Sequence, residues 1–156
     1  MSKVDKLLKE NISDDGTIVN LRDKFLGIRG MMELATNSAL ANVRELVLPG
    51  NQCADEGAEA LANSPHLGNL EMLNLNHNDI GDEGAIAIAN SEKFPKLKSL
   101  SMFGNVIGDE GAKAFADSPQ SKKYLKLDLY KNQVTGDGNK LITESEMLKN
   151  CEELEI

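Results

Sequence analysis

The chain has 156 residues, and 25 acidic against 17 basic side chains give it a formal net charge of −8. A chain this acidic is unsuited to binding nucleic acid or an anionic membrane, since both require an excess of Lys and Arg. Two cysteines are too few for a disulfide framework or a Cys-rich zinc site. The apolar runs are far shorter than the roughly 20 residues of a membrane span, and no secretory signal is visible, so we expect a cytoplasmic protein without a membrane partner.

Residues 1–15 are expected to form an N-terminal capping helix. Apolar side chains recur there at helical spacing, at Val4, Leu7, Leu8 and Ile12. The polar residues 13–16 then end the helix. An amphipathic helix in this place would cover the open end of the first coil of a solenoid, as terminal caps do in repeat proteins.

Residues 16–150 consist of five consecutive repeats of 27 residues, with no insertion or deletion, so each residue has a position from one to 27. An aliphatic residue occupies position four in every repeat, at Val19, Leu46, Leu73, Leu100 and Leu127. Asparagine occupies position nine in four repeats, at Asn51, Asn78, Asn105 and Asn132. The first repeat is degenerate, because it has Lys24 at this position.

Each repeat predicts a strand, a turn and a helix. Positions one to six alternate apolar and variable residues, which is the pattern of a strand with one buried face. Strands that recur every 27 residues lie parallel and side by side. A turn rich in Asn and Gly follows, and then a helical segment such as residues 57–62. One unit cannot bury its apolar face alone, so the repeats must stack.

Two polar features recur with the repeat. The Asn at position nine is expected to bond backbone groups of neighbouring coils, because a buried amide needs hydrogen-bond partners. The acidic sequence Gly-Asp-Glu-Gly-Ala occupies residues 81–85 and 108–112, with a variant at residues 54–58. We predict that its Asp caps a helix start. A divalent-cation site along the stacked carboxylates is the alternative.

Residues 151–156 begin a sixth repeat. They supply positions one to six, with Glu152, Glu153 and Glu155 along the strand. Charges of this kind guard a strand edge against pairing. Two explanations are open: the chain is a fragment of a longer scaffold protein, or the uncapped C-terminal strand mediates self-association.

The repeated pattern resembles a known family. Residues 70–80 read Leu-x-x-Leu-x-Leu-x-x-Asn-x-Ile, and Gly-Asp-Glu-Gly-Ala follows. This combination resembles the leucine-rich repeat of the ribonuclease-inhibitor-like class. The resemblance implies an α/β right-handed solenoid, a horseshoe arc with a parallel β-sheet on the concave side and short helices on the convex side. Relatives bind ribonucleases, activate small GTPases, cap actin filaments or act as bacterial effectors, and no motif in this chain carries one of these activities over.

Candidate catalytic groups are few. His66 and His77 have no cysteine beside them in the sequence. Cys53 and Cys151 occupy positions where other repeats carry Leu, Ile or Val, so both are expected to pack as small apolar residues. No phosphate-binding glycine loop and no zinc-protease motif is present. We therefore expect no catalysis, no cofactor and no metal.

The outward positions of the strands, together with the strand exits, form the candidate binding surface. Phe103 and Tyr130 occupy position seven in neighbouring repeats, where core packing does not require a ring. Exposed aromatic rings beside charged side chains have the composition of an interface hot spot. The candidate partner-binding residues are Phe103, Tyr130, Met72, Val47, His77, Lys126, Asp128 and Lys131. The alternative is that the two rings only protect the sheet or pack against a loop.

These features predict a non-catalytic protein–protein interaction module that binds a protein or peptide on its concave face. An acidic surface favours a basic partner, and it also serves solubility. Two other functions stay open. One is a regulator of a partner enzyme, either an inhibitor or an activator, including an effector secreted without a classical signal. The other is a scaffold segment of a larger protein.

Overall fold

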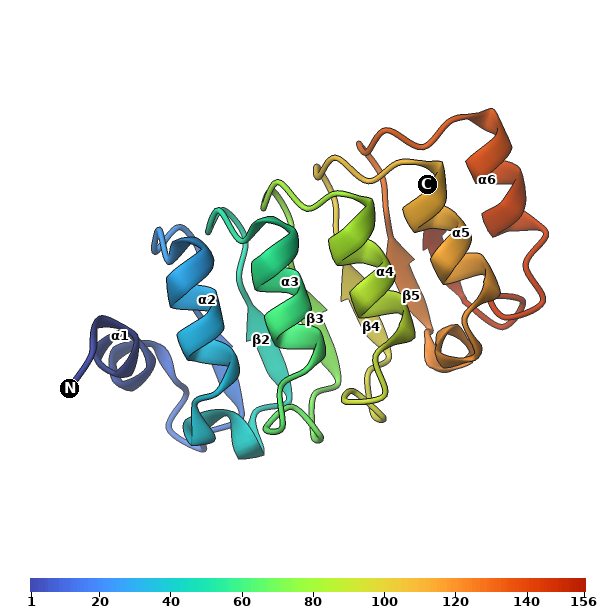
Figure 1. Ribbon diagram of the computed structural model, residues 1–156. Coiled ribbons are helices and arrows are strands. Elements are labelled where there is room, and N and C mark those ends of the chain that lie inside the picture. The colour runs from blue at the N-terminus through green and yellow to red at the C-terminus, as the bar shows by residue number, and fades with distance from the viewer.

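The chain forms an α/β solenoid in which strands alternate with helices, as the repeats predicted (Figure 1). The computed structural model describes residues 1–156. The strands are β1 (Ile18–Asn20), β2 (Glu45–Val47), β3 (Met72–Asn74), β4 (Ser99–Ser101), β5 (Lys126–Asp128) and β6 (Glu153–Glu155). The α-helices are α1 (Lys3–Asn11), α2 (Gly27–Ala35), α3 (Ala54–Ala62), α4 (Asp82–Asn90), α5 (Asp109–Asp117) and α6 (Gly136–Thr143). Two 3₁₀ helices, η1 (Ser38–Asn42) and η2 (Pro119–Lys123), lie in the return segments.

The six strands form one parallel sheet in chain order, and each residue pairs with the residue 27 places further on. The strands are shorter than predicted and cover positions three to five only. Backbone hydrogen bonds between coils continue beyond them, from Leu48 N to Asn74 O at 2.9 Å and from Gly50 N to Asn76 O at 3.0 Å. Position eight then adopts a left-handed backbone, with φ of 69° at Gly50 and Gly104, and turns the chain off the sheet.

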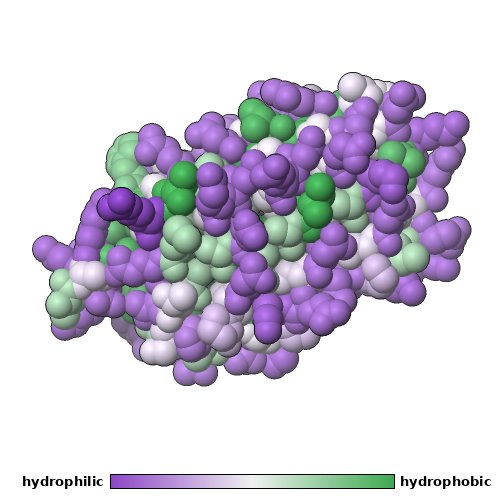
Figure 2. Space-filling model, viewed as in Figure 1, coloured by the Kyte–Doolittle hydropathy of each residue, from purple (hydrophilic) through white to green (hydrophobic).

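One hydrophobic core of 37 buried side chains runs the length of the solenoid, between the sheet and the helices. The position-four residues Leu46, Leu73 and Leu100 are fully buried, as the alternation predicted. Val4 and Leu8 of α1 join the core at the first coil. The opposite, outer face of the helices is mostly hydrophilic with isolated hydrophobic side chains (Figure 2).

The recurring Asn at position nine connects neighbouring coils, as predicted. Asn78 Oδ1 accepts one hydrogen bond from Asn51 N at 2.9 Å and another from Cys53 N at 3.3 Å. Its Nδ2 donates to Leu48 O at 2.9 Å. All three partners belong to the preceding coil. The two backbone amides, Asn51 N and Cys53 N, would otherwise be buried without a partner.

The Asp of the acidic sequence also connects coils, which corrects part of the prediction. Asp82 is the first residue of α4, yet its Oδ1 accepts hydrogen bonds from Gly108 N and Gly111 N, both at 2.8 Å. These amides lie at the start of α5. The carboxylate therefore caps the helix of the following coil and not its own, and there it also meets the positive end of the helix dipole. Asp55 does the same one coil earlier.

The glycine at position fifteen makes this contact possible. A Cβ atom on Gly84 would lie 2.7 Å from both Asp55 Oδ1 and Ile80 Cγ2. It would also lie 3.1 Å from Ala58 Cβ on the neighbouring helix. Each distance is shorter than ordinary van der Waals contact, so the close packing of α3 against α4 requires glycine here.

A third polar position connects the coils at the other end of the helices, and the sequence analysis missed it. Serine recurs every 27 residues, at Ser64, Ser91, Ser118 and Ser145. Ser118 Oγ donates to Ala89 O at the end of α4, at 2.7 Å, and accepts from Gln120 N at 3.2 Å. The hydroxyl thus satisfies a carbonyl that the helix itself leaves unpaired. The period of 27 was the signal that could have revealed it.

Candidate functional site

The sheet face brings Phe103 and Tyr130 together at the ends of β4 and β5. Their ring centroids lie 6.1 Å apart and the ring planes make an angle of 44°. This separation is within the range of attractive aromatic pairs. Phe103 is half-buried, whereas Tyr130 remains 51% exposed. The two rings form one continuous surface of which Tyr130 is the accessible part.

His77 and Lys131 complete this cluster at position eight. The His77 ring stands edge-on to Phe103, with centroids 5.3 Å apart and an interplanar angle of 83°. Lys131 Nζ lies over the Phe103 ring, 5.6 Å from the ring centroid. A Cβ atom on Gly104 would collide with the His77 ring, so this glycine leaves the space that the imidazole fills. We call His77, Phe103, Tyr130 and Lys131 the aromatic cluster.

The backbone at His77 and Lys131 has the left-handed conformation that all five repeats adopt at position eight. Both residues have φ of 54°, in the left-handed region where glycine is favoured, and the same position carries glycine at Gly50 and Gly104. A side chain other than glycine costs roughly 1–2 kcal/mol in this conformation. The same conformation recurs at position eight in all five repeats, so it belongs to the turn that leads the chain off the sheet. Sequence alignment of the repeats, with glycine at position eight in two of five, was the signal for this strain.

The other predicted residues lie around the cluster to different degrees. Lys126 forms an ion pair with Glu153 across the sheet, at 3.1 Å. Asp128 Oδ1 accepts a hydrogen bond from Tyr130 N at 3.0 Å and so helps to fix the start of the turn that carries the ring. Met72 lies beside Ser99 in the register of β3 and β4. Val47 on β2 is two strands away from β4, and the structure does not bring it to the rings.

Asn76 is a positioning residue that the sequence analysis did not single out. Its Oδ1 accepts hydrogen bonds from Ser101 Oγ at 2.6 Å and from Phe103 N at 2.9 Å. This contact crosses from one coil to the next. The backbone that carries the Phe103 ring is therefore held by the preceding coil.

Comparison with known proteins identifies the family of the sequence repeats. The sequence model of the leucine-rich repeat family matches residues 39–62, 66–89 and 95–116. Residues 39–116 therefore contain leucine-rich repeats. No curated protein sequence matches it.

Two solved structures resemble the leucine-rich repeat chain over nearly its whole length. One is actin-binding site 2 of leiomodin-1, with a TM-score of 0.66, 20% identity, and coverage of 96% of this chain and 90% of that one. The other is the C-terminal domain of tropomodulin from Caenorhabditis elegans, with a TM-score of 0.53, 16% identity, and coverage of 99% and 83%. At these identities the likeness shows the fold.

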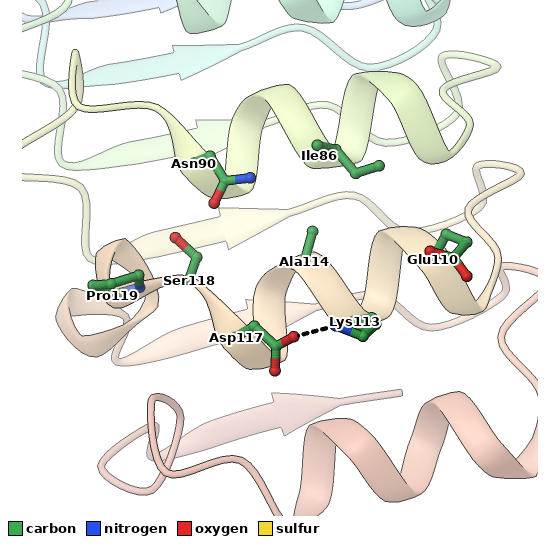
Figure 3. Close-up of a pocket in the computed structure, with 8 residues that line it drawn as sticks. All are labelled: Ile86, Asn90, Glu110, Lys113, Ala114, Asp117, Ser118 and Pro119. Atoms are coloured by element: carbon green, nitrogen blue, oxygen red, sulfur yellow. Dashed lines mark hydrogen bonds and ion pairs between the residues drawn. The ribbon is translucent and has the colours of Figure 1, made fainter.

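The leucine-rich repeat chain also has a shallow hollow of about 320 Å³ on its helix side (Figure 3). It lies between α4 and α5, with Ile86 on one wall and the ion pair of Lys113 with Asp117 on the other. Ser118 at its end already donates its hydroxyl to a helix carbonyl. The hollow is far from the aromatic cluster and contains no nucleophile with an adjacent base.

The two thiols are poor nucleophiles. Burial raises the pKa of Cys53 to about 12, with smaller contributions from Asp55 and Glu56, and burial also raises the pKa of Cys151. The structure contains no group of three or more His, Cys, Asp or Glu side chains that could hold a metal ion. No helix is long and apolar enough to cross a membrane.

Proposed function

We propose that this leucine-rich repeat protein is a non-catalytic interaction module that binds a protein or peptide on its concave sheet face. The observation that carries the proposal is the aromatic cluster, in which an exposed Tyr130 ring is supported by Phe103. Rigid aromatic side chains supply a large contact area at low entropic cost and dominate the energy of many interfaces.

The test is a comparison of partner capture by the wild type and by Phe103→Ala/Tyr130→Ala. The immobilised protein is the bait, and a lysate of the source cells supplies the candidate partners. Purified monomeric actin is a defined second probe, because one structural neighbour is an actin-binding site. We expect the double variant to capture at least tenfold less partner than the wild type does. Hot-spot aromatic residues typically contribute about 2 kcal/mol or more each.

The matched control is Ile86→Ala/Leu141→Ala, which removes two exposed apolar side chains from the helix side. All three proteins must have the same melting temperature, so that a loss of folding is not mistaken for a loss of binding. Equal capture by the wild type and the aromatic double variant would contradict the proposal. Capture lost only in the control variant would move the site to the helices.

Self-association through β6 is a second candidate, and one observation favours it. β6 pairs with β5 on one side only, and Leu154 and Ile156 are partly exposed there. An unpaired strand edge can pair with another chain. Light scattering over a range of concentrations tests this candidate, and a monomer at the highest concentration would contradict it.

A further inference from the structure

Strands β5 and β6 carry two pairs of opposed side chains on the sheet face, and only one pair has opposite charges. The register places Lys126 opposite Glu153 and Asp128 opposite Glu155. The first pair forms an ion pair at 3.1 Å. The second pair consists of two carboxylates, and neither has a cationic group within 4.0 Å.

Asp128 and Glu155 are a like-charged pair on neighbouring strands. Residues opposite each other on neighbouring strands are about 4.8 Å apart, and like charges in this arrangement destabilise a sheet. Asp128 uses Oδ1 to accept from Tyr130 N, and its Oδ2 makes no hydrogen bond. Glu155 is exposed and its side chain has no hydrogen-bond partner. Both carboxylates are therefore available to a cationic ligand.

The exposed aromatic ring lies directly beside this pair. Tyr130 follows Asp128 by two residues on the same face, and its ring is 51% exposed. The nearest basic residue of the cluster, Lys131, has its Nζ over the Phe103 ring and forms no ion pair with either carboxylate. An exposed aromatic ring and two free carboxylates thus lie near the ends of the neighbouring strands β5 and β6.

We propose that Tyr130, Asp128 and Glu155 bind an arginine side chain of the partner. The proposal rests on the proposed function and names the chemistry of its partner. A guanidinium group can stack on an aromatic ring and donate parallel hydrogen bonds to carboxylates at the same time. The ammonium of lysine lacks the planar fork that this geometry uses. The formal charge of −8 attracts a basic segment to the same surface.

The probe is the peptide acetyl-Arg-Gly-Arg-amide, titrated into the uniformly ¹⁵N-labelled protein and followed by NMR. In the control peptide both arginines are replaced by citrulline, which keeps the shape of the side chain and removes its charge. We expect saturable shifts at Asp128, Tyr130 and Glu155 with the arginine peptide, and affinity at least tenfold weaker with the citrulline peptide. Shifts spread over the acidic helices, or equal affinity for both peptides, would overturn the proposal.

The decisive variant is Asp128→Asn/Glu155→Gln, which removes two charges and retains an oxygen that can accept from Tyr130 N. The matched control is Glu83→Gln/Glu110→Gln, with the same change in net charge on the exposed starts of α4 and α5. We expect the first variant to bind the arginine peptide about tenfold more weakly than the wild type and the control to bind it within a factor of about two. An equal loss in both variants would show a general charge effect and overturn the assignment.

The same variants separate this inference from the proposed function. If Asp128→Asn/Glu155→Gln captures the cellular partner as well as the wild type does, while Phe103→Ala/Tyr130→Ala does not, the arginine site is wrong and the aromatic interface stands. If neither double variant changes capture, both proposals are wrong. If both variants lose capture and the peptide assay shows the expected selectivity, both are supported.

Discussion

The helix side and the sheet face of this solenoid follow opposite rules. On the helix side the same contact recurs in successive coils, as when Asp55 and then Asp82 each cap the next helix. On the sheet face the same position changes in every coil, as from Met72 to Ser99 to Lys126. Positions that repeat are those that stacking requires. Positions that vary are free of that requirement, and a partner can be recognised there.

Among substitutions at the repeated positions, Asn78→Ala is expected to cause the largest loss of stability. The substitution leaves Asn51 N and Cys53 N without an acceptor in the core, and it removes one of the two side-chain amides that donate to Leu48 O. A buried backbone group without a partner costs roughly 1–3 kcal/mol, so we expect a loss of about 4 kcal/mol in the free energy of unfolding. Urea denaturation measures it.

The control for this variant is Asn90→Ala, at the exposed end of α4. Its amide makes no side-chain hydrogen bond, so we expect its free energy of unfolding to stay within about 0.5 kcal/mol of the wild type. Similar losses in the two variants would mean that the position-nine contacts contribute little to stacking.

A second substitution that should destabilise the packing of the helices is Gly84→Ala. One methyl group must then fit against Asp55 Oδ1 and Ile80 Cγ2, where no space exists. Overpacking of this kind costs about 2 kcal/mol. The matched substitution is Gly68→Ala, because a Cβ atom there meets nothing within 4 Å. Thermal unfolding of the pair measures the difference, and equal melting temperatures would contradict the packing argument.

The sequence predicted the fold well because its information is periodic. Position four, with Leu46 and Leu73 as examples, is buried in all five complete repeats, and one register accounts for the whole sheet. The sequence could not say that Asp82 caps the next helix and not its own, because spacing alone does not measure the distance between coils. Ser118 was overlooked because a serine in a loop resembles an ordinary turn residue until its period is noticed.

The candidate site was less predictable from the sequence. The pairing of Phe103 with Tyr130 follows from the repeat length, and the structure places the two rings 6.1 Å apart. The left-handed backbone of His77 does not follow from hydrophobic pattern, since it depends on how the chain leaves the sheet. Whether these residues bind a partner stays a prediction.

A smaller effect, dependent on pH, is expected at Asp109. Hydrogen bonds from the hydroxyl and backbone N–H of Thr135 lower the pKa of this carboxyl below its usual 3.8. The folded state therefore binds a proton less readily than the unfolded state, and its stability falls as the pH drops through about 4 and below. We expect Asp109→Asn to lose less stability than the wild type as the pH falls from about 5 to about 2. Asp14→Asn, which removes a carboxylate without hydrogen bonds, should follow the wild type in the same urea titrations.

The smallest effect on stability is expected at Lys131 on the sheet face. There, stability and partner capture are expected to respond differently to the same pair of substitutions. Lys131→Gly and Lys131→Ala both remove the ammonium group over the Phe103 ring, and they differ only in a Cβ atom on a backbone with φ of 54°. A left-handed alanine costs roughly 1–2 kcal/mol, and the greater freedom of glycine in the unfolded chain offsets about half of this, so we expect the glycine variant to be about 0.5–1 kcal/mol more stable than the alanine variant. Partner capture should fall equally in both, because both lose the same side chain. Equal stability would mean that this backbone is not strained, and capture at the wild-type level in both variants would remove Lys131 from the binding surface.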